Sequence, residues 1–233
     1  MSPRSRREPG STASVVSEPV PDPPIDTPID TPIDTVILDF GGVVVDWDMR
    51  HLFRTLFDDT EEMERFLATV LTPAENVRCD LGVPIADVVG GLVERHPDHR
   101  VPLEAWRDRW IETVPATIEG IEELIDELRA NGIGVYGLSN FSAETFPLTR
   151  ARYDVFDRFD GIVISGEVGM VKPQPEIYRL VCERHGLTVS RCVFVDDSPV
   201  NVRGAEAVGM PALHFTGVAG LRRELGALGI DLT

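Results

Sequence analysis

Short runs of apolar residues recur along most of the chain, and each is followed by polar residues and then by a stretch with helical spacing. The first run covers residues 35–38 and stops at Asp39, which is followed by Phe40, Gly41 and Gly42. Such a short apolar run is typical of a strand buried on both faces, and two glycines let the backbone turn sharply behind it. Further runs predict strands at residues 133–138, 161–164, 192–195 and 212–215.

Helices are predicted between these strands, where apolar residues repeat at spacings of three and four. Thr117 is the expected N-cap of the first such helix, and Asn131 with Gly132 is its expected stop. Short strands that alternate with helices are typical of a parallel sheet covered on both faces, so the pattern predicts an α/β fold. The helices are expected at residues 118–130, 172–185, 199–208 and 221–228, with a weaker one after residue 140.

Residues 48–117 contain no predicted strand. Their apolar spacing and their punctuation by proline predict an all-helical block, and its position just after the first strand indicates a lid over that strand's end. Trp106 and Trp110 stand four residues apart, a spacing more typical of a core face than of a ligand platform. The four helices are expected at residues 50–57, 61–71, 84–95 and 102–113.

The first 34 residues differ in composition from the rest. The sequence PIDT occurs three times in succession, at Pro24, Pro28 and Pro32, and repeated proline predicts an extended tail. Two interpretations remain open, a docking or spacer segment and a disordered leader. The basic residues at the start are not followed by an apolar run, so we expect neither a secretory signal nor a membrane span.

Composition and charge narrow the class of protein further. The chain has 233 residues and 42% hydrophobic content, enough for one domain with an insertion or for two small domains. A formal net charge of -17 repels nucleic acid and anionic membranes, so neither is an expected partner. Cys79, Cys182 and Cys192 are odd in number and lack CxxC spacing, which argues against a disulfide framework and favours a cytoplasmic location.

Polar residues gather where the predicted strands end. Asp39, Ser139 and the pair Asp196-Asp197 follow three strands, and Lys172 precedes a predicted helix. The carboxyl ends of parallel strands share one edge of the sheet, so these side chains are expected to meet. Three carboxylates there repel one another beyond what one lysine can neutralise, and Mg²⁺ suits such ligands. Asp39 then becomes a nucleophile, while Ser139 and Lys172 bind phosphoryl oxygens.

The four polar elements resemble the four motifs of the haloacid dehalogenase-like hydrolases, in order and in strand context. They read LDFGG at Asp39, LSN at Ser139, KPQPEIY at Lys172 and VFVDDSPVN at Asp196. The resemblance, to subfamily I with an α-helical cap, implies a Rossmann-like parallel sheet core with a helical cap domain inserted after the first strand. It implies a leader at residues 1–34, a core at 35–48 and 115–233, and a cap at 49–114.

The resemblance also implies a chemistry, an aspartyl-phosphate on Asp39 that releases phosphate from a small phosphorylated metabolite. We expect this protein to be a monomer or a homodimer. Asp39, Lys172 and Ser139 take the catalytic roles. Mg²⁺ is implied at Asp39, the carbonyl of Gly41, Asp197 and Asp196, with Asn201 beside them, and substrate contacts are implied for Ser139, Asn140, Lys172 and Gly42.

Gly41 departs from the family pattern. Phosphatases of the family usually read Asp-x-Asp, and the second Asp transfers a proton, a contribution of about 10²- to 10⁴-fold that glycine cannot make. In lacking this second Asp, the motifs resemble those of the small bacterial α-glucose-1-phosphate phosphatases. The resemblance implies a substrate whose leaving group is acidic, as in a sugar 1-phosphate or an acyl phosphate. Asp46 and Asp48 are candidate substitutes, with a solvated turn or helix N-cap as their structural interpretation.

Two other functions remain open. A 2-haloacid dehalogenase also uses the first Asp and lacks the second, although the intact Asp196-Asp197 pair favours a metal site. A catalytically weak binding or regulatory protein of the same fold is the non-enzymatic alternative, and Gly41 is its best support. The residues that select the substrate are also open, because spacing does not tell which of Trp47, Arg50, Asn76 and Arg78 faces the site.

Overall fold

The computed structural model describes residues 32–232. Residues 1–31 of the predicted leader, with the repeats at Pro24 and Pro28, lie outside the described residues. Its last residues belong to the folded part: Ile33 is buried in the core, and Asp34 O accepts from Gly134 N at 2.9 Å.

A parallel sheet forms the centre of the fold and confirms the predicted α/β class. Its five strands stand in the order β3-β2-β1-β4-β5, so the first strand along the chain lies in the middle. All four residues of this central strand are buried, as its β-branched composition predicts. The strands are β1 (Thr35–Leu38), β2 (Gly134–Ser139), β3 (Gly161–Ile164), β4 (Cys192–Asp196) and β5 (Ala212–His214), within one or two residues of the predicted ranges.

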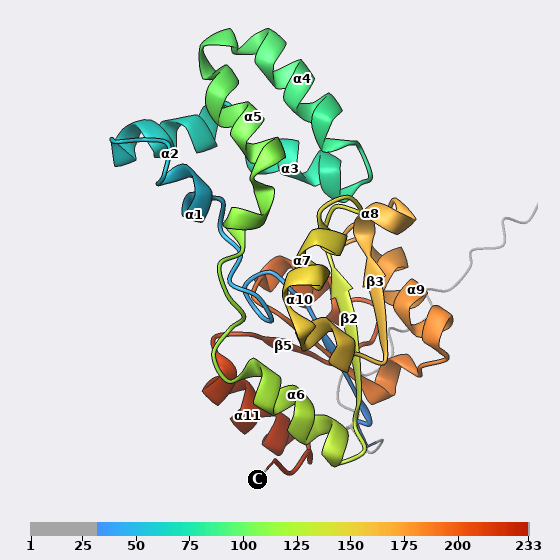
Figure 1. Cartoon of the computed structure of the whole chain (residues 1–233). Coiled ribbons are helices and arrows are strands. Elements are labelled where there is room, and N and C mark those ends of the chain that lie inside the picture. Colours follow the sequence, from blue (N-terminus) through green and yellow to red (C-terminus); the bar gives the residue numbers. More distant parts are fainter. Residues whose placement is uncertain (1–31, 233) are drawn as a thin grey trace, which may run out of the picture. The chain divides into compact units, whose positions relative to one another are not determined.

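Helices cover both faces of the sheet (Figure 1). Successive residues of a strand point to opposite faces, so Val36 and Leu38 belong to one core cluster and Ile37 to another. The first cluster includes α6 (Ile121–Ala130) and α11 (Val218–Ala227), and the second includes α9 (Pro175–His185) and α10 (Pro199–Glu206). Two shorter helices, α7 (Phe146–Arg152) and α8 (Ser165–Val168), follow β2 and β3.

Two helices start three residues later than predicted, and α11 starts three residues earlier, at Val218. The helix expected from residue 118 begins later and has Gly120 as its N-cap, because Thr117 is held in an antiparallel bridge with Val45. The helix expected from Lys172 begins at Pro175, because the backbone of Lys172 is bound by the side chain of Asn140. Both residues therefore belong to connections.

The described residues between β1 and α6 form helices and connections but no named strand. The helices are α1 (Met49–Phe53), α2 (Thr60–Thr69), α3 (Pro73–Asp80), α4 (Ile85–Arg95) and α5 (Arg100–Asp108), with the 3₁₀ turns η1 (Pro97–His99) and η2 (Trp110–Thr113). We call residues 49–113 the helical segment.

Helix α3 and the break between α5 and η2 were not predicted. The α3 sequence, PAENVRCD, is mostly polar and carries little periodic signal. The helix expected over residues 102–113 ends at Asp108, so Trp106 and Trp110 lie on different elements. Both tryptophans are buried in the hydrophobic core cluster, as predicted, and both also line the cavity described below.

The two connections to the helical segment run side by side. Asp46 N donates to Ala116 O at 3.0 Å, and Asp48 N donates to Thr113 O at 3.0 Å. Farther along, Ser165 Oγ in α8 donates to the carbonyl of Asp80 at 2.6 Å. The helical segment is therefore hydrogen-bonded to the sheet-bearing part of the chain at Thr113, next to its two connections, and at Asp80 in α3.

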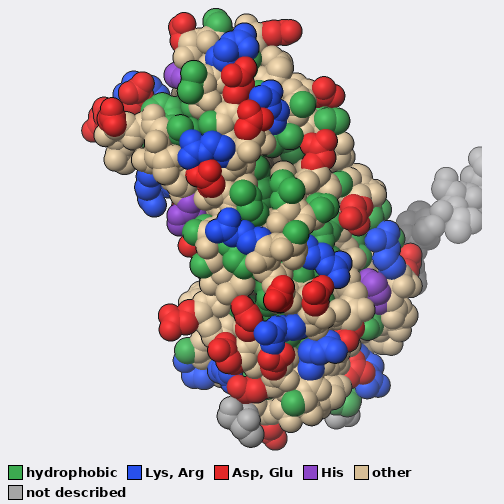
Figure 2. Space-filling model, in the orientation of Figure 1, with side chains coloured by type: hydrophobic (Ala, Val, Ile, Leu, Met, Phe, Trp, Pro, Cys, Tyr) green, Lys and Arg blue, Asp and Glu red, His purple; other side chains and the backbone are tan. Residues whose placement is uncertain are grey.

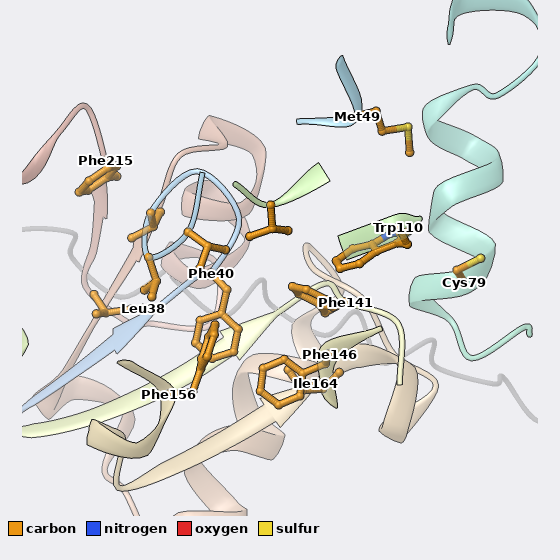
Figure 3. Packing of buried hydrophobic residues seen from close by; sticks show 14 of the residues in the cluster. Leu38, Phe40, Met49, Cys79, Trp110, Phe141, Phe146, Phe156, Ile164 and Phe215 are labelled. Atoms are coloured by element: carbon orange, nitrogen blue, oxygen red, sulfur yellow. The ribbon is translucent and has the colours of Figure 1, made fainter. Parts of the chain in front are cut away.

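An aromatic cluster supports the end of β1 from below (Figure 3). The Phe40 ring packs against Phe146, Phe156 and Phe159, with ring centroids 5.6, 4.9 and 5.4 Å away. A Cβ added at Gly137 in the neighbouring strand would lie 2.3 Å from Phe40 Cζ, so only glycine fits beneath the ring. Because Phe40 directly follows Asp39, this packing helps to hold that carboxylate in place.

No helix within residues 32–232 is long and apolar enough to cross a membrane.

Candidate active site

Five polar residues meet at the carboxyl edge of the sheet. Asp39 follows β1, Ser139 ends β2, and Asp196 ends β4 with Asp197 beyond it. Lys172 lies in the loop before α9. Parallel pairing of β2, β1 and β4 puts all three strand ends at the same level, so the residues that sequence reasoning selected are together in space.

Lys172 bridges two carboxylates in the floor of the site. Its Nζ lies 2.8 Å from Asp39 Oδ1 and 2.6 Å from Asp196 Oδ2, and its side chain is 0% exposed. Burial works to lower the pKa of Lys172, but the two carboxylates outweigh burial and raise it above its usual value. The lysine is therefore a fixed positive charge in the site.

Asp39 is held by three donors at one oxygen. Its Oδ1 accepts from Ser139 Oγ at 2.7 Å and from the Phe40 backbone N–H at 2.6 Å, besides its contact with Lys172. Burial raises the pKa of Asp39 to about 7, Lys172 opposes that rise, and the nearby charge of Asp196 adds to it. Three donors on a single oxygen fix the orientation of the carboxylate.

Asn140 and Asn201 hold other residues of the site in place. The Asn140 side chain accepts from Lys172 N at 2.8 Å and donates to Lys172 O at 3.0 Å. Asn201 Nδ2 donates to both oxygens of Asp196, at 3.1 and 3.2 Å, and Ser198 N donates to Oδ1 at 2.8 Å. Both oxygens of Asp196 are therefore engaged by the protein.

Three carboxylates of the site form an acidic cluster. Asp39, Asp196 and Asp197 each offer a carboxylate oxygen, and the three oxygens lie within 4.8 Å of one another. Asp197 is exposed as a whole residue, but its carboxyl is partly shielded from solvent. This desolvation, followed by the nearby charge of Asp196, raises the pKa of Asp197. Carboxylates so arranged fit a hard divalent cation such as Mg²⁺.

The two glycines after Phe40 differ in what surrounds them. Gly42 has a φ of 75°, and a Cβ added there would lie 2.4 Å from Asp197 Oδ2. A Cβ on Gly41 would make an ordinary contact with Trp47, 3.6 Å away. A side chain is thus excluded at Gly42 and sterically possible at Gly41, where family phosphatases carry their second Asp.

Asp46 and Asp48, the two candidates to replace the second Asp that is absent at Gly41, have different surroundings. Asp48 is the N-cap of α1, its Oδ1 accepts from Arg50 N at 2.9 Å, and it lines the cavity described below. Asp46 Oδ1 lies 3.1 Å from His51 Nε2, and Asp46 is not among the described residues lining that cavity. The N-cap interpretation is confirmed for Asp48.

A cavity of about 700 Å³ lies between this edge of the sheet and the helical segment. Asp39, Ser139 and Asp197 line one part of it, and α1, α2, α3 and α5 contribute to the rest. Trp47, Arg50 and Asn76 line it, as do Trp106 and Trp110, whereas Arg78 is not among its described lining residues. Sequence reasoning named Asn76 of α3 as a candidate but missed the other lining residues from α2 and α3, because only their contacts across the fold identify them.

Residues 33–209 match the haloacid dehalogenase-like hydrolase family. The chain belongs to this family, and its parallel sheet with acidic residues at the carboxyl edge agrees with that assignment.

Known relatives resemble parts of the chain. The sesquiterpene phosphatase astK of Aspergillus oryzae is 40% identical over 93 residues, which are 40% of this chain and 47% of that protein. Flavin mononucleotide hydrolase 1 of Arabidopsis thaliana is 28% identical over 116 residues, which are 50% of this chain and 47% of that protein. In each case the match spans about half of the relative's length.

Solved structures share the fold. A haloacid dehalogenase-family enzyme of Bacteroides thetaiotaomicron has a TM-score of 0.65 at 21% identity, with 80% of this chain and 95% of that chain covered. A structure of the same enzyme with magnesium and inorganic phosphate has a TM-score of 0.59 at 23% identity, with 79% and 95% covered.

Proposed function

We propose that this protein is a Mg²⁺-dependent phosphatase that acts through an aspartyl-phosphate on Asp39. The carrying observation is the arrangement around that carboxylate, with Ser139 and Lys172 bound to one oxygen and the acidic cluster beside it. A phosphoester in the cavity has its phosphorus next to Asp39, and the helical segment acts as a cap that keeps bulk water out.

The residues divide the chemistry among them. Ser139 and Lys172 bind phosphoryl oxygens, and Asp39 attacks phosphorus through Oδ2, the oxygen with no hydrogen bond among the described contacts. The bond to the leaving oxygen breaks, and water then hydrolyses the acyl phosphate to regenerate the carboxylate. Mg²⁺, when bound, supplies positive charge against the phosphoryl oxygens. Asp39 and Asp197 are the residues we assign to hold it, while Asp196 keeps Lys172 in place.

Two relatives, the sesquiterpene phosphatase and Phosphatase MT3486 of Mycobacterium tuberculosis, carry phosphatase in their names, and this supports the reaction class. The predicted likeness to α-glucose-1-phosphate phosphatases, and with it a sugar phosphate as substrate, stays a prediction. Gly41 supplies no proton, so esters with acidic leaving groups are the substrates that such a site hydrolyses fastest.

Dehalogenation is the second candidate on this fold, and two solved dehalogenases have TM-scores of 0.62 and 0.59 at 17% identity. The cluster of Asp39, Asp196 and Asp197 supports phosphoryl chemistry instead, because halide displacement uses no cation. The remaining candidate is a binding or regulatory protein that performs no chemistry. Such a protein would not need a nucleophile at Asp39.

Phosphate release from 4-nitrophenyl phosphate tests the proposal, measured with Mg²⁺ and with EDTA. We expect release only with Mg²⁺, its loss in Asp39→Asn, and its retention in the matched control Asp98→Asn on an exposed turn. Halide release from 2-chloropropionate in EDTA would instead establish a dehalogenase. Binding of inorganic phosphate without turnover of any ester would establish the non-enzymatic alternative.

A further inference from the structure

We propose that the organic group of the substrate is a bulky hydrocarbon, so that the substrate is the phosphate ester of an apolar alcohol. This inference rests on the proposed function and names its substrate class. It departs from the sugar phosphate expected from the sequence, and the observations that carry it are the side chains of the cavity beyond Asp39.

The walls of the cavity away from the acidic cluster are mostly apolar. Figure 3 shows Met49, Cys79, Trp110 and Phe141, from different parts of the chain, around the space between the helical segment and the sheet. The Trp110 and Phe141 rings lie 5.3 Å apart between centroids. Leu67, Leu71, Val77, Ile85 and Trp106 add to the same lining. Hydrocarbon buried there gains about 25 cal/mol per Å² of apolar surface.

Arg50 and Asn76 in the helical part of the lining are already paired with the protein, whereas the buried Trp106 Nε1 has no hydrogen-bond partner among the described residues. Arg50 forms two contacts with Glu64, Nε to Oε1 at 2.6 Å and Nη2 to Oε2 at 2.8 Å, and its Nη1 reaches Asp48 at 3.3 Å. Asn76 Nδ2 donates to Asp80 Oδ2 at 3.0 Å. A sugar with several hydroxyl groups would have to compete for these groups or leave its own hydroxyls without partners, at about 1–3 kcal/mol each.

Asn140 and Ser142 on the sheet side are engaged in the same way, whereas the buried Thr145 Oγ1 has no partner among the described residues. Asn140 is bound to the backbone of Lys172, and Ser142 Oγ accepts from Glu144 N at 3.1 Å. Arg50 is the one cation among the described lining residues, and Glu64 and Asp48 neutralise it. The cavity therefore offers no second charged site for a nucleotide or a sugar bisphosphate, and Trp106 Nε1 and Thr145 Oγ1 are the neutral polar atoms that its lining leaves for the organic group.

Exposed apolar side chains mark the same region. Val77 lines the cavity although its side chain is 38% exposed, and its helix α3 forms part of the wall. In Figure 2 hydrophobic side chains are visible on the surface where the helical segment meets the rest of the fold. A hydrocarbon ligand would cover such surface.

A series of n-alkyl phosphates tests the inference, because the leaving group stays the same while apolar surface grows. With Mg²⁺ we expect kcat/KM to rise roughly two- to fourfold per methylene from butyl to octyl phosphate. Isothermal titration with the matching n-alkylphosphonates should give the same trend in Kd without turnover. Glucose 6-phosphate, whose leaving oxygen is also that of a primary alcohol, should be a poorer substrate than octyl phosphate.

Paired variants locate the effect in the cavity. Val77→Asn should weaken binding of octylphosphonate about fivefold and leave butylphosphonate within twofold. The control Val101→Asn, in α5 and 71% exposed outside the described lining, should change neither. Both sites are on helix surfaces, so neither change removes a core contact.

The outcomes separate the two proposals. Equal kcat/KM across the alkyl series, or glucose 6-phosphate hydrolysed faster than octyl phosphate, would overturn the hydrocarbon inference while 4-nitrophenyl phosphate turnover leaves the phosphatase intact. Loss of Mg²⁺-dependent turnover with every ester, 4-nitrophenyl phosphate included, would overturn both.

Discussion

The carboxylate of Asp197 lies directly against the backbone of Gly42. A Cβ added to Gly42 would be 2.4 Å from Asp197 Oδ2, and the φ of 75° is unfavourable for any other residue. The close approach puts an exposed acid beside Asp39 at the place where we assign the cation. Gly42 is thus a spatial requirement of the proposed Mg²⁺ site.

Gly42→Ala should therefore displace Asp197 and weaken Mg²⁺ binding. We expect a loss of stability of roughly 1–3 kcal/mol from the strained backbone and a Mg²⁺ affinity at least tenfold lower. Thermal unfolding with and without Mg²⁺, together with calorimetric titration of the ion, would measure both. Gly41→Ala is the matched control, since a Cβ there makes only a 3.6 Å contact with Trp47. Equal Mg²⁺ affinity in the two variants would contradict this view.

Lys172→Met should destabilise the protein because it leaves Asp39 and Asp196 buried without their shared cation. Removing one partner of a buried pair typically costs about 3–5 kcal/mol. Protonation relieves the unpaired carboxylates, so the loss should be smaller at pH 5 than at pH 8. Urea unfolding at both pH values checks this, and a loss that grows toward pH 5 would refute the argument. Lys172 is the only lysine of the chain, so ¹⁵N-lysine labelling also reports on this site alone in the wild type.

Gly41 should make the rate depend strongly on the leaving group. Without a proton donor, 4-nitrophenyl phosphate is expected to react far faster than octyl phosphate in the wild type. Gly41→Asp has room for its Cβ and places a carboxyl where the family's second Asp stands, so it should narrow that ratio by roughly tenfold or more. The ratio of kcat values for the two esters is the measurement. An unchanged ratio would mean that another group already transfers the proton.

Asp48→Asn distinguishes a structural role from proton transfer. Asparagine caps a helix as well as aspartate, so the α1 N-cap bond to Arg50 N should persist, with a stability change of about 0.5 kcal/mol or less. We expect kcat for octyl phosphate within twofold of the wild type, and the same for Asp46→Asn. A fall of tenfold or more in Asp48→Asn alone, with a changed pH profile, would identify Asp48 as the missing acid.

Asp80 should make stability fall as the pH rises. Burial raises the pKa of this carboxyl to about 7, while Lys172 and the hydrogen bond from Asn76 oppose that rise. The folded protein therefore holds a proton that the unfolded chain loses near pH 4, so this contribution weakens stability between about pH 4 and pH 7 and changes little above. Asp80→Asn should remove the effect.

The expected gain in Asp80→Asn is up to roughly 4 kcal/mol at pH 8 and close to zero at pH 4. Unfolding by urea across this range, with Asp98→Asn as a surface control, measures the difference. A variant that is equally stable relative to wild type at every pH would show that Asp80 is ionised in the folded protein.

Residues near the strand ends were the part of the site most open to prediction. Asp39, Ser139 and Asp196 each follow an apolar run, and parallel strands bring such positions to one edge whatever the rest of the chain does. Their chemical roles stay predictions. The particular contacts of Asn140 and Asn201 were less accessible, because a side-chain amide serves equally well for substrate and for backbone, and only the fold shows what lies opposite it.

The side chains that line the cavity were, by contrast, hardly open to prediction from the sequence. Arg50 and Arg78 read as free cations in the sequence, yet Glu64, 14 residues beyond Arg50, takes up the first, and Glu75 takes up the second at 2.7 Å. Helix α3 has little apolar periodicity because its polar residues face solvent or the cavity. The Arg50–Glu64 pair has no local signal, whereas Glu75 and Arg78 stand three residues apart on one helix, a spacing typical of such a pair.

The sequence by itself determined the α/β class, the five strands and the row of polar residues beyond them, because these follow from short-range patterns of burial and turn formation. The tertiary structure alone decided which side chains of the helical segment reach the site and which are already paired. The physical reason is that a substrate pocket is made by contacts between residues far apart in the chain, and those contacts leave no periodic trace along it.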